Sequence, residues 1–373
     1  MTEILITHLG VATPLGNSIS SLWNRLISGH TAIRPITRFD TKPYGSKFAA
    51  WKDLPVDREN ISALEVLLES LWEGVGSLPS NTLLIAATTK GGVDILEQIE
   101  RGHTVASSGF WPGETAQSIA NDLTISSGAF NISAACASGS AAVCQGAALI
   151  QANIADAVLV CAFDLVSEFV FSGFSALKIL SPEPCRPFDQ NREGLTLGEG
   201  AAAILLIEPS LAKSEDRKRL GSVVGWAMTN DANHITSPSK SGKGLVQAIG
   251  KALTIADLRP VEIGAICAHG TGTVYNDLME LKAIQKVFGS RHIPIFSVKG
   301  AMGHTLGAAG ALEVCIASKA LDEQRVPPTC GCRKPEKGAE KMVSDKIVSF
   351  DADYILSVNS GFGGINTALI ISR

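Results

Sequence analysis

A cysteine and a histidine, each at the end of an apolar segment, could perform chemistry together in this 373-residue chain. Cys136 stands among small residues in Ser133-Ala-Ala-Cys-Ala-Ser-Gly-Ser140 and directly precedes an Ala- and Gly-rich stretch. If that stretch is a helix, its N-terminal dipole stabilises a thiolate, and the small neighbours leave room for a substrate to reach the sulfur. A buried structural cysteine is the alternative interpretation of this pattern. His269 follows an apolar segment in the same way and opens a Gly- and Thr-rich loop.

Two further segments add a cation, a second histidine and a flexible turn. Lys299 and His304 share the loop Ser297-Val-Lys-Gly-Ala-Met-Gly-His304, which also precedes a small-residue stretch. A lysine in so apolar a segment needs a partner if it is buried, and Glu313 is the nearest carboxylate downstream. The turn Gly361-Phe-Gly-Gly364 can aim a main-chain N–H at an oxyanion.

These residues are expected to meet because each lies where a strand gives way to a loop. Short apolar runs alternate with small-residue helical stretches, which predicts an α/β fold, and open α/β sheets place their sites at the carboxyl ends of strands. The expected strands are Glu3–Thr7, Leu83–Ala87, Ala157–Cys161, Ala201–Ile207, Ile263–Cys267, Ile295–Val298, Ile355–Val358 and Thr367–Ile371. The expected helices are Ser20–Ser28, Ala137–Gln151, Gly244–Leu253, Asp277–Phe288 and Gly307–Leu321.

The sequence also contains a weak internal echo. Asn131–Gln151 and Phe296–Leu321 both show a strand end, a loop and a small-residue helix, and in both halves a Gly-rich turn precedes the next apolar strand. This order predicts a duplicated α/β unit, with one half over residues 1–212 and the other over residues 213–373. The polar segment Lys213–Arg219 is the expected boundary.

Composition excludes several other classes of protein. With 45% apolar and 18% charged residues the chain can bury a large core, and a net charge of −4 without a long basic run argues against nucleic-acid binding. We see no signal peptide and no apolar stretch of about 18 residues, so we expect no membrane span. The cysteines are too sparse for a disulfide scaffold and predict reduced thiols in the cytoplasm. Cys330-Gly-Cys332 lacks the second pair of a zinc site, so we expect no metal.

The ordered motifs resemble those of the β-ketoacyl-acyl-carrier-protein synthases, the condensing enzymes with a Cys-His-His triad. The resemblance covers nearly the whole chain and rests on these segments: Gly10–Gly16, Ala135–Gly139, Arg186–Asp189, Gly198–Ala201, His269–Thr273, Lys299–His304 and Gly361–Gly364. It implies the thiolase fold, with five α-β-α-β-α layers built from two similar halves, and a dimer.

The resemblance also assigns roles to the reactive residues. Cys136 would hold an acyl group as a thioester, while His269 and His304 stabilise the enolate formed when malonyl-carrier protein loses CO₂. The main-chain N–H groups of Cys136 and Phe362, in the loop with Gly361 and Gly363, would hold the tetrahedral oxyanion.

The resemblance implies supporting roles for further residues. Lys299 would support the catalytic loop, with Glu313 as its structural partner, and Thr271 and Thr273 would contact the phosphopantetheine arm of the acyl carrier protein. Arg186 would face that carrier protein. No metal or other cofactor is implied. The basic run Lys213, Arg217, Lys218 and Arg219 is a second candidate carrier surface, with a solvated linker helix as its other interpretation.

Three departures from the family pattern concern the substrate. The last loop reads Asn359-Ser360-Gly361-Phe362 and lacks the first of two phenylalanines, the one that gates the acyl pocket, as in type II polyketide and polyene ketosynthases. The chain is shorter than the usual member around Trp51–Leu83, and Gly272 replaces a usual serine. Fatty-acid, polyketide and aryl-polyene pathways therefore stay open, as do a homodimer and a heterodimer.

Other proteins of the same fold fit these residues less well. A thiolase uses a second cysteine in the last loop, where this chain has Ser360-Gly361-Phe362, and the initiating synthases use Cys-His-Asn, where this chain has His304. The non-enzyme alternative is a chain-length factor, a catalytically inactive partner of a ketosynthase, but such subunits normally lose the nucleophile.

Overall fold

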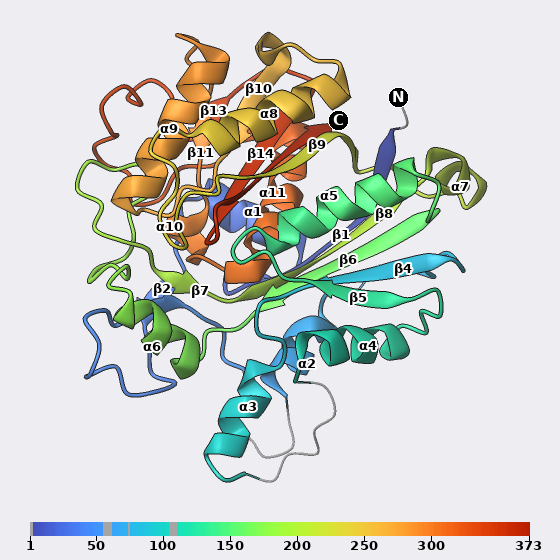
Figure 1. Cartoon of the computed structure of the whole chain (residues 1–373), viewed down its shortest axis with the longest axis horizontal. Coiled ribbons are helices and arrows are strands. Elements are labelled where there is room, and N and C mark those ends of the chain that lie inside the picture. The colour runs from blue at the N-terminus through green and yellow to red at the C-terminus, as the bar shows by residue number, and fades with distance from the viewer. Residues whose placement is uncertain (1–2, 55–61, 74, 104–109) are drawn as a thin grey trace.

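A ten-stranded sheet runs through the computed structural model, which describes residues 3–373 apart from 55–61, 74 and 104–109 (Figure 1). Its strand order is β11-β10-β14-β15-β9-β1-β8-β6-β4-β5. The N-terminal sheet half consists of β1 (Ile4–Ala12), β4 (Thr82–Ala87), β5 (Ala129–Ile132), β6 (Ala157–Asp164) and β8 (Gly200–Ile207). The C-terminal sheet half consists of β9 (Gly221–Asn230), β10 (Ile263–Cys267), β11 (Ile295–Phe296), β14 (Tyr354–Gly361) and β15 (Ile365–Ser372).

The two sheet halves have the same topology. In each, the first strand (β1 or β9) pairs antiparallel with the last (β8 or β15), which pairs antiparallel with β6 or β14. The next two strands, β4 and β5 or β10 and β11, follow in parallel. The halves join where Ile4–Ile6 of β1 pairs with 221–223 of β9. The predicted duplicated α/β unit is therefore present, while the division at residue 212 stays a prediction.

Period-2 alternation along the strands creates five layers. Ile204 and Leu206 of β8 face a central cluster that contains α5 (Ser138–Gln151) and α11 (Ala309–Glu323), and Leu205 faces the opposite side of the sheet. On that outer side α2 (Ala63–Glu69) and α4 (Pro112–Asp122) cover the N-terminal sheet half. Two further helices, α8 (Lys243–Ala256) and α9 (Val274–Phe288), cover the outer face of the C-terminal sheet half. Figure 1 shows this order from α2 and α4 at the bottom to α8 and α9 at the top.

The central helices α5 and α11 approach each other closely at two glycines. A Cβ added at Gly139 would lie 2.7 Å from the main-chain N of Ala311, and one at Gly310 would lie 2.6 Å from the Cβ of Ser140. No side chain fits at either point. Because Cys136 precedes α5 and His304 precedes α11, this crossing brings the two halves' loops together.

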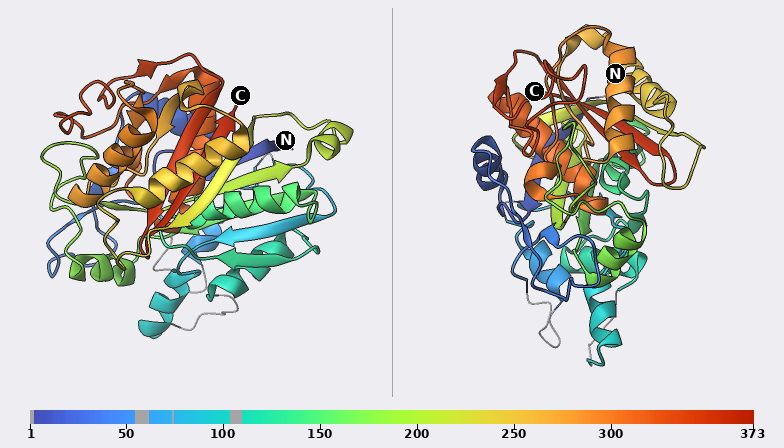
Figure 2. Two further views of the ribbon diagram at one scale, coloured as in Figure 1. Left: turned by 45° about the horizontal axis from the view of Figure 1, so that its top comes forward. Right: turned by 90° about the vertical axis from the view of Figure 1, so that its left-hand side faces the viewer.

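The remaining described elements lie around this core. The strands β2 (Ile33–Pro35), β3 (Phe48–Ala50) and β7 (Leu197–Gly198) form a small second sheet, seen beside α6 (Glu168–Ala176) at one end of the molecule (Figures 1 and 2). The others are α1 (Ile19–Ile27), α3 (Val93–Glu100), α7 (Pro209–Ser214), α10 (Lys299–Met302), β12 (Arg325–Val326), β13 (Val348–Ser349) and the 3-10 turns Pro260–Glu262 and Leu306–Ala308.

The expected strands and helices are confirmed, with shifted ends. The strand expected at 295–298 is shorter, because its last two residues lead into α10. Of the strands in the large sheet, sequence reasoning missed β9 and recognised only the end of β5. β5 has only four residues, and β9 contains a glycine whose added Cβ would meet the main-chain O of Ala252 at 2.3 Å. Lys213 lies in the last turn of α7, which ends at Ser214, and Arg217–Arg219 lie in the connection to β9.

Candidate active site

Cys136 lies in the loop between β5 and α5, immediately before the helix. Ala135 adopts φ +48°, a left-handed conformation that non-glycine residues rarely take and that costs on the order of 1–3 kcal/mol. Ser138 holds this turn, because its Oγ donates to the Ala135 carbonyl at 2.6 Å and accepts from the Ala134 N–H at 2.9 Å. The turn therefore fixes the direction of the Cys136 thiol at the helix N-terminus.

Opposing effects act on the Cys136 thiol. Burial raises its pKa to about 11, opposite in direction to the thiolate stabilisation expected from a helix end. The cations of Lys90 and Lys299 and a hydrogen bond from the Phe362 main-chain N–H lower the pKa, while Asp164 raises it. The free protein therefore carries a neutral thiol at pH 7, with a main-chain donor aimed at its sulfur.

His269 follows β10 and is held on both sides of its ring. Its main-chain N–H and that of Gly270 donate to the carboxylate of Glu280, both at 2.7 Å. Its Nδ1 lies 3.0 Å from Asn359 Oδ1, and Asn359 Nδ2 donates to Glu313 Oε2 at 2.6 Å. Since a carboxylate only accepts, the amide of Asn359 is oriented, and Nδ1 of His269 must be the donor. The neutral ring then keeps its Nε2 lone pair free.

Lys299 and Glu313 form a fully buried ion pair beside His269. Both side chains are 1% exposed. Lys299 Nζ also donates to the His269 carbonyl at 2.6 Å and lies 3.3 Å from His269 Nδ1. Lys299, Glu313, Asn359 and His269 thus form one connected network in which each buried charge has a partner.

His304 has the opposite tautomer. Its Nδ1 accepts the main-chain N–H of Leu306 at 3.3 Å, so a neutral ring carries its hydrogen on Nε2. The rings of His269 and His304 meet edge to face with centroids 5.2 Å apart. Burial lowers the pKa of both histidines well below the usual range, and Lys299 adds to this effect. The site therefore offers one neutral lone pair and one neutral N–H donor.

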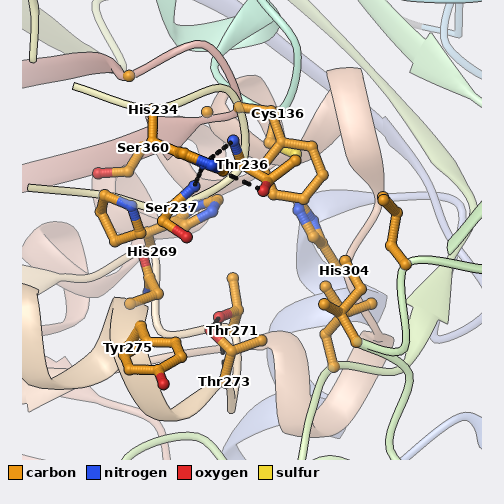
Figure 3. Close-up of a pocket in the computed structure, with 18 of the residues that line it drawn as sticks. Cys136, His234, Thr236, Ser237, His269, Thr271, Thr273, Tyr275, His304 and Ser360 are labelled. Carbon is orange, nitrogen blue, oxygen red and sulfur yellow. Dashed lines mark hydrogen bonds between the residues drawn. The ribbon is translucent and has the colours of Figure 1, made fainter. Parts of the chain in front are cut away.

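Cys136, His269 and His304 share one cavity of about 290 Å³ (Figure 3). Thr271, Thr273, Gly361 and Phe362 also line it. The apolar part of the lining is Phe174, Leu177, Ile179 and Leu195, and the Phe174 ring stacks on Phe362 with centroids 6.1 Å apart. His234, Thr236 and Tyr275 complete the upper and lower walls in Figure 3. The cavity thus joins a polar reactive end to an apolar wall.

The remaining residues that the sequence predicts for the site differ in whether they reach the cavity. A Cβ on Gly361 would lie 3.3 Å from the main-chain N of Cys136, so the two segments touch. Gly363 does not line the cavity; its N–H donates to the Ile235 carbonyl at 2.6 Å, and its carbonyl accepts from Asn230. Arg186 is half-buried next to Gly272 rather than in the cavity wall. Thr271 and Thr273 hydrogen-bond to each other at 2.9 Å.

Sequence reasoning missed the residues that orient the histidines. Asn359 and Glu280 are fully buried, and burial raises the pKa of Glu280 to about 8. The available signal was Glu280, an acid on the helix that begins shortly after His269. Many buried acids have only structural roles, so this signal did not single it out. Lys90 was also missed, although a lysine directly after an apolar strand is as unusual as Lys299.

The described residues contain neither a metal cluster nor a membrane-spanning helix. No group of three or more His, Cys, Asp or Glu side chains could hold a metal ion there, and Cys330 and Cys332 are free thiols. No helix within the described ranges has the length and apolar character needed to cross a membrane.

Comparison with known proteins gives a consistent family. The family described as "Beta-ketoacyl synthase, N-terminal domain" matches residues 77–212, and "Beta-ketoacyl synthase, C-terminal domain" matches residues 220–333. The chain is 31% identical to 3-oxoacyl-[acyl-carrier-protein] synthase 2 of Coxiella burnetii, over 100% of this chain and 98% of the relative. It is 32% identical to the protein of the same name from Vibrio cholerae, over 100% of this chain and 99% of the relative.

Solved structures agree with this assignment. The ishigamide ketosynthase/chain length factor superposes with a TM-score of 0.87 at 27% identity, covering 100% of this chain and 99% of the other. A ketosynthase in complex with its chain length factor from Xenorhabdus doucetiae gives a TM-score of 0.84 at 27% identity, with 100% and 98% covered. The chain therefore belongs to the β-ketoacyl synthase family and has its thiolase fold.

Proposed function

We propose that the protein is a β-ketoacyl-acyl-carrier-protein synthase, an acyltransferase that joins an acyl group to the two-carbon unit of malonyl-carrier protein. The observation that carries the proposal is the meeting of Cys136, His269 and His304 in one cavity, with the Phe362 N–H aimed at the sulfur. The relatives named 3-oxoacyl-[acyl-carrier-protein] synthase 2 support fatty-acid synthesis as the pathway.

The first half-reaction is acyl transfer. The Cys136 thiol gives up its proton, and its sulfur attacks the thioester carbonyl of an acyl-carrier protein. A tetrahedral oxyanion forms, accepts hydrogen bonds from the Cys136 and Phe362 N–H groups, and collapses. The carrier thiolate leaves and takes up a proton, so no net proton is consumed. Losing one such donor typically costs on the order of 3 kcal/mol in the barrier.

The second half-reaction forms the carbon–carbon bond. The Nε2–H of His304 donates to the thioester oxygen of malonyl-carrier protein, and its neutral state suits a donor that meets a developing enolate. Loss of CO₂ leaves that enolate, whose carbon attacks the Cys136 thioester. The C–S bond breaks, the Cys136 thiolate is released, and it regains a proton. Each condensation takes up one proton from solvent, and the Nε2 lone pair of His269 is the group in the cavity that can accept this proton and pass it to the thiolate. This tautomer assigns the hydrogen bond to the enolate to His304, whereas the resemblance implied that both histidines stabilise the enolate.

Lys299 and Glu313 support this chemistry without touching the substrate. Their ion pair orients Asn359, which fixes the tautomer of His269. Burial, with the Lys299 charge adding to it, lowers the pKa of both histidines and keeps them neutral. Thr271 and Thr273 lie on the cavity wall where the phosphopantetheine arm would enter. The reaction needs no metal or further cofactor, because loss of CO₂ drives the condensation.

The partner and location belong to the proposal as well. Acyl carrier protein is the expected partner, with Arg186 on its docking face, and the enzyme works in the cytoplasm as a homodimer or beside a chain-length factor. A solved neighbour is a ketosynthase in complex with its chain length factor, which makes the heterodimer worth testing. This chain keeps Cys136, so it would be the active subunit of such a pair.

Intact-protein mass spectrometry tests the proposal. The protein and its Cys136→Ala variant are incubated with acyl-carrier proteins of different chain length. A mass gain equal to the acyl group in the wild type alone supports the proposal, and the preferred chain indicates the pathway. Acylation of neither protein, also after co-expression with a chain-length factor, would contradict it. Cys144→Ala is the matched control, because that cysteine lies in α5, does not line the cavity and is also buried.

A further inference from the structure

A second lysine stands at the carboxyl edge of the N-terminal sheet half. β4 lies between β5 and β6 and runs parallel to both, so the three strands end at the same edge. Cys136 follows β5, Asp164 ends β6, and Thr88-Thr89-Lys90 follows β4. This is the edge at which an open α/β sheet collects its functional residues.

Asp164 connects Lys90 to the loop that carries His304. The Asp164 carboxylate is fully buried, and Lys90 Nζ lies 3.5 Å from its Oδ2 with 18% of the lysine side chain exposed. Thr88 Oγ1 donates to Asp164 Oδ1 at 2.8 Å. The main-chain N–H of Gly307 donates to Asp164 Oδ2 at 2.7 Å. Gly307 is three residues after His304, so the carboxylate ties the β4 loop to the segment that follows this histidine.

The pair has a counterpart in the C-terminal sheet half. β4 corresponds to β10 and β6 to β14 in the duplicated topology. His269 follows β10 and contacts Asn359 of β14, just as Lys90 follows β4 and contacts Asp164 of β6. The chain thus places a base and an amide on one side of the site and a cation and a carboxylate on the other.

We propose that Lys90 is a positioning residue of the condensation site: through its ion pair with Asp164 it holds the segment after His304, and it brings a positive charge to the sheet edge that also carries Cys136. A role for Lys90 in catalysis rests on the proposed function. The effect of its charge on the Cys136 thiol and on His304 does not, and it can be measured separately. Lys90 is a second cation besides Lys299, and the two act from opposite halves.

The charges around the two reactive groups give the direction of the effect. Lys90 and Lys299 lower the pKa of Cys136 against burial and against Asp164. The same lysines add to burial in lowering the pKa of His304, and His269 is the other titratable ring in contact with it. Removing Lys90 therefore raises both pKa values, and the unpaired Asp164 carboxylate raises that of Cys136 further.

The experiment measures the rate at which iodoacetamide alkylates Cys136 from pH 6 to pH 10.5, with the label mapped to the Cys136 peptide. In Lys90→Met we expect the rate at a given pH to fall and the profile to move upward by about 0.5–1 pH unit. Lys90→Arg should restore the wild-type profile. Lys251→Met, an exposed lysine on α8, is the control and should change nothing. A Lys90→Met profile identical to the wild type would overturn the inference.

A second readout separates positioning from stability. Thermal unfolding shows whether Lys90→Met is folded, and Lys90→Gln serves if it is not. In the condensation assay, the fall of activity at low pH should move to higher pH in the variant, because His304 becomes protonated more readily. Alkylation needs no carrier protein, so the inference can fail while the wild type still becomes acylated. Conversely, absence of acylation in the wild type contradicts the proposed function and leaves the alkylation shift measurable.

Discussion

The two sheet halves share a strand order but place different chemistry at their carboxyl edges. The N-terminal sheet half presents Cys136 before α5, and the C-terminal sheet half presents His304 before α11. Both loops contain a non-glycine residue with positive φ, Ala135 at +48° and Leu306 at +55°. Both halves thus have a strained residue at the equivalent point before the helix. In the proposed function one edge supplies the nucleophile and the other a hydrogen-bond donor.

The lysines of the two halves differ in how completely they are enclosed. Lys299 is 1% exposed and pairs with a carboxylate that is equally buried. The side chain of Lys90 is 18% exposed next to a fully buried Asp164. A lysine ammonium that stays in contact with water loses little hydration free energy, whereas a fully buried one needs an ion-pair partner. The difference predicts that Lys299 is part of the core and that Lys90 is free to act on the site.

The largest expected effect breaks the enclosed pair. Lys299→Met leaves the Glu313 carboxylate buried without a cation, so we expect the free energy of unfolding in urea to fall by about 3–5 kcal/mol. Lys90→Met should cost less, about 1–2 kcal/mol, because the buried Asp164 carboxylate keeps its hydrogen bonds from Thr88, Thr89 and the Gly307 N–H. The double variant Lys299→Met/Glu313→Gln should recover most of the loss. Equal losses for Lys299→Met and Lys90→Met would remove the distinction between the halves.

The next effect separates the role of the loop before α5, which carries Cys136, from that of the loop before α11, which carries His304. In His304→Ala the donor for the enolate is gone, so we expect condensation to fall by about 100-fold or more, as for other positioned proton donors. Acylation of Cys136 should fall by less than about tenfold, because its oxyanion donors are main-chain N–H groups. Single-turnover acylation and steady-state condensation are measured on the same preparation. Parallel losses in both steps would contradict the division of labour.

The third prediction concerns the crossing of the central helices. Gly139→Ala or Gly310→Ala forces α5 and α11 apart, and we expect each to lower the free energy of unfolding by about 1–3 kcal/mol. Gly250 in α8 is the control, because no atom lies within 4 Å of an added Cβ. There the gain in helix propensity should stabilise the protein by up to about 1 kcal/mol. Thermal unfolding with the same sign for all three variants would show that the crossing is not tightly packed.

The duplicated fold could be predicted because its signal is local. Each sheet half repeats a strand, a loop and a small-residue helix, and β6, β8, β10 and β15 are apolar enough to be recognised alone. β9 was missed, since Gly225 and Trp226 interrupt its pattern for a reason that lies outside it: the Ala252 carbonyl packs against Gly225. A contact between two elements cannot be predicted from the strand propensity of the residues in one of them.

The reactive residues could be found for the same reason, but their orienting partners could not. His269 and His304 each follow a strand that the sequence identifies, and Cys136 precedes a helix that it identifies. Asn359 lies near the end of β14 and Asp164 ends β6, and both look like ordinary polar residues in the sequence. Only the pairing of β14 with β10 and of β6 with β4 sets them beside a histidine and a lysine. The thiol's raised pKa was also unforeseeable, because it depends on burial by residues from both halves.

The smallest predicted effect concerns the aromatic pair Phe174–Phe362, which lies across the cavity. Phe174 of α6 stacks on Phe362 of the β14–β15 turn, and such pairs contribute about 0.5–1.5 kcal/mol beyond area burial. In Phe174→Leu we expect a roughly 2- to 10-fold rise in the KM for the acyl donor with little change in kcat, because the ring lines the apolar wall and not the reactive end. Phe169→Leu on the same helix is the control, since Phe169 is 61% exposed. If kcat falls instead, the ring positions the Phe362 N–H as well as the acyl chain, and the two halves are coupled through the oxyanion loop.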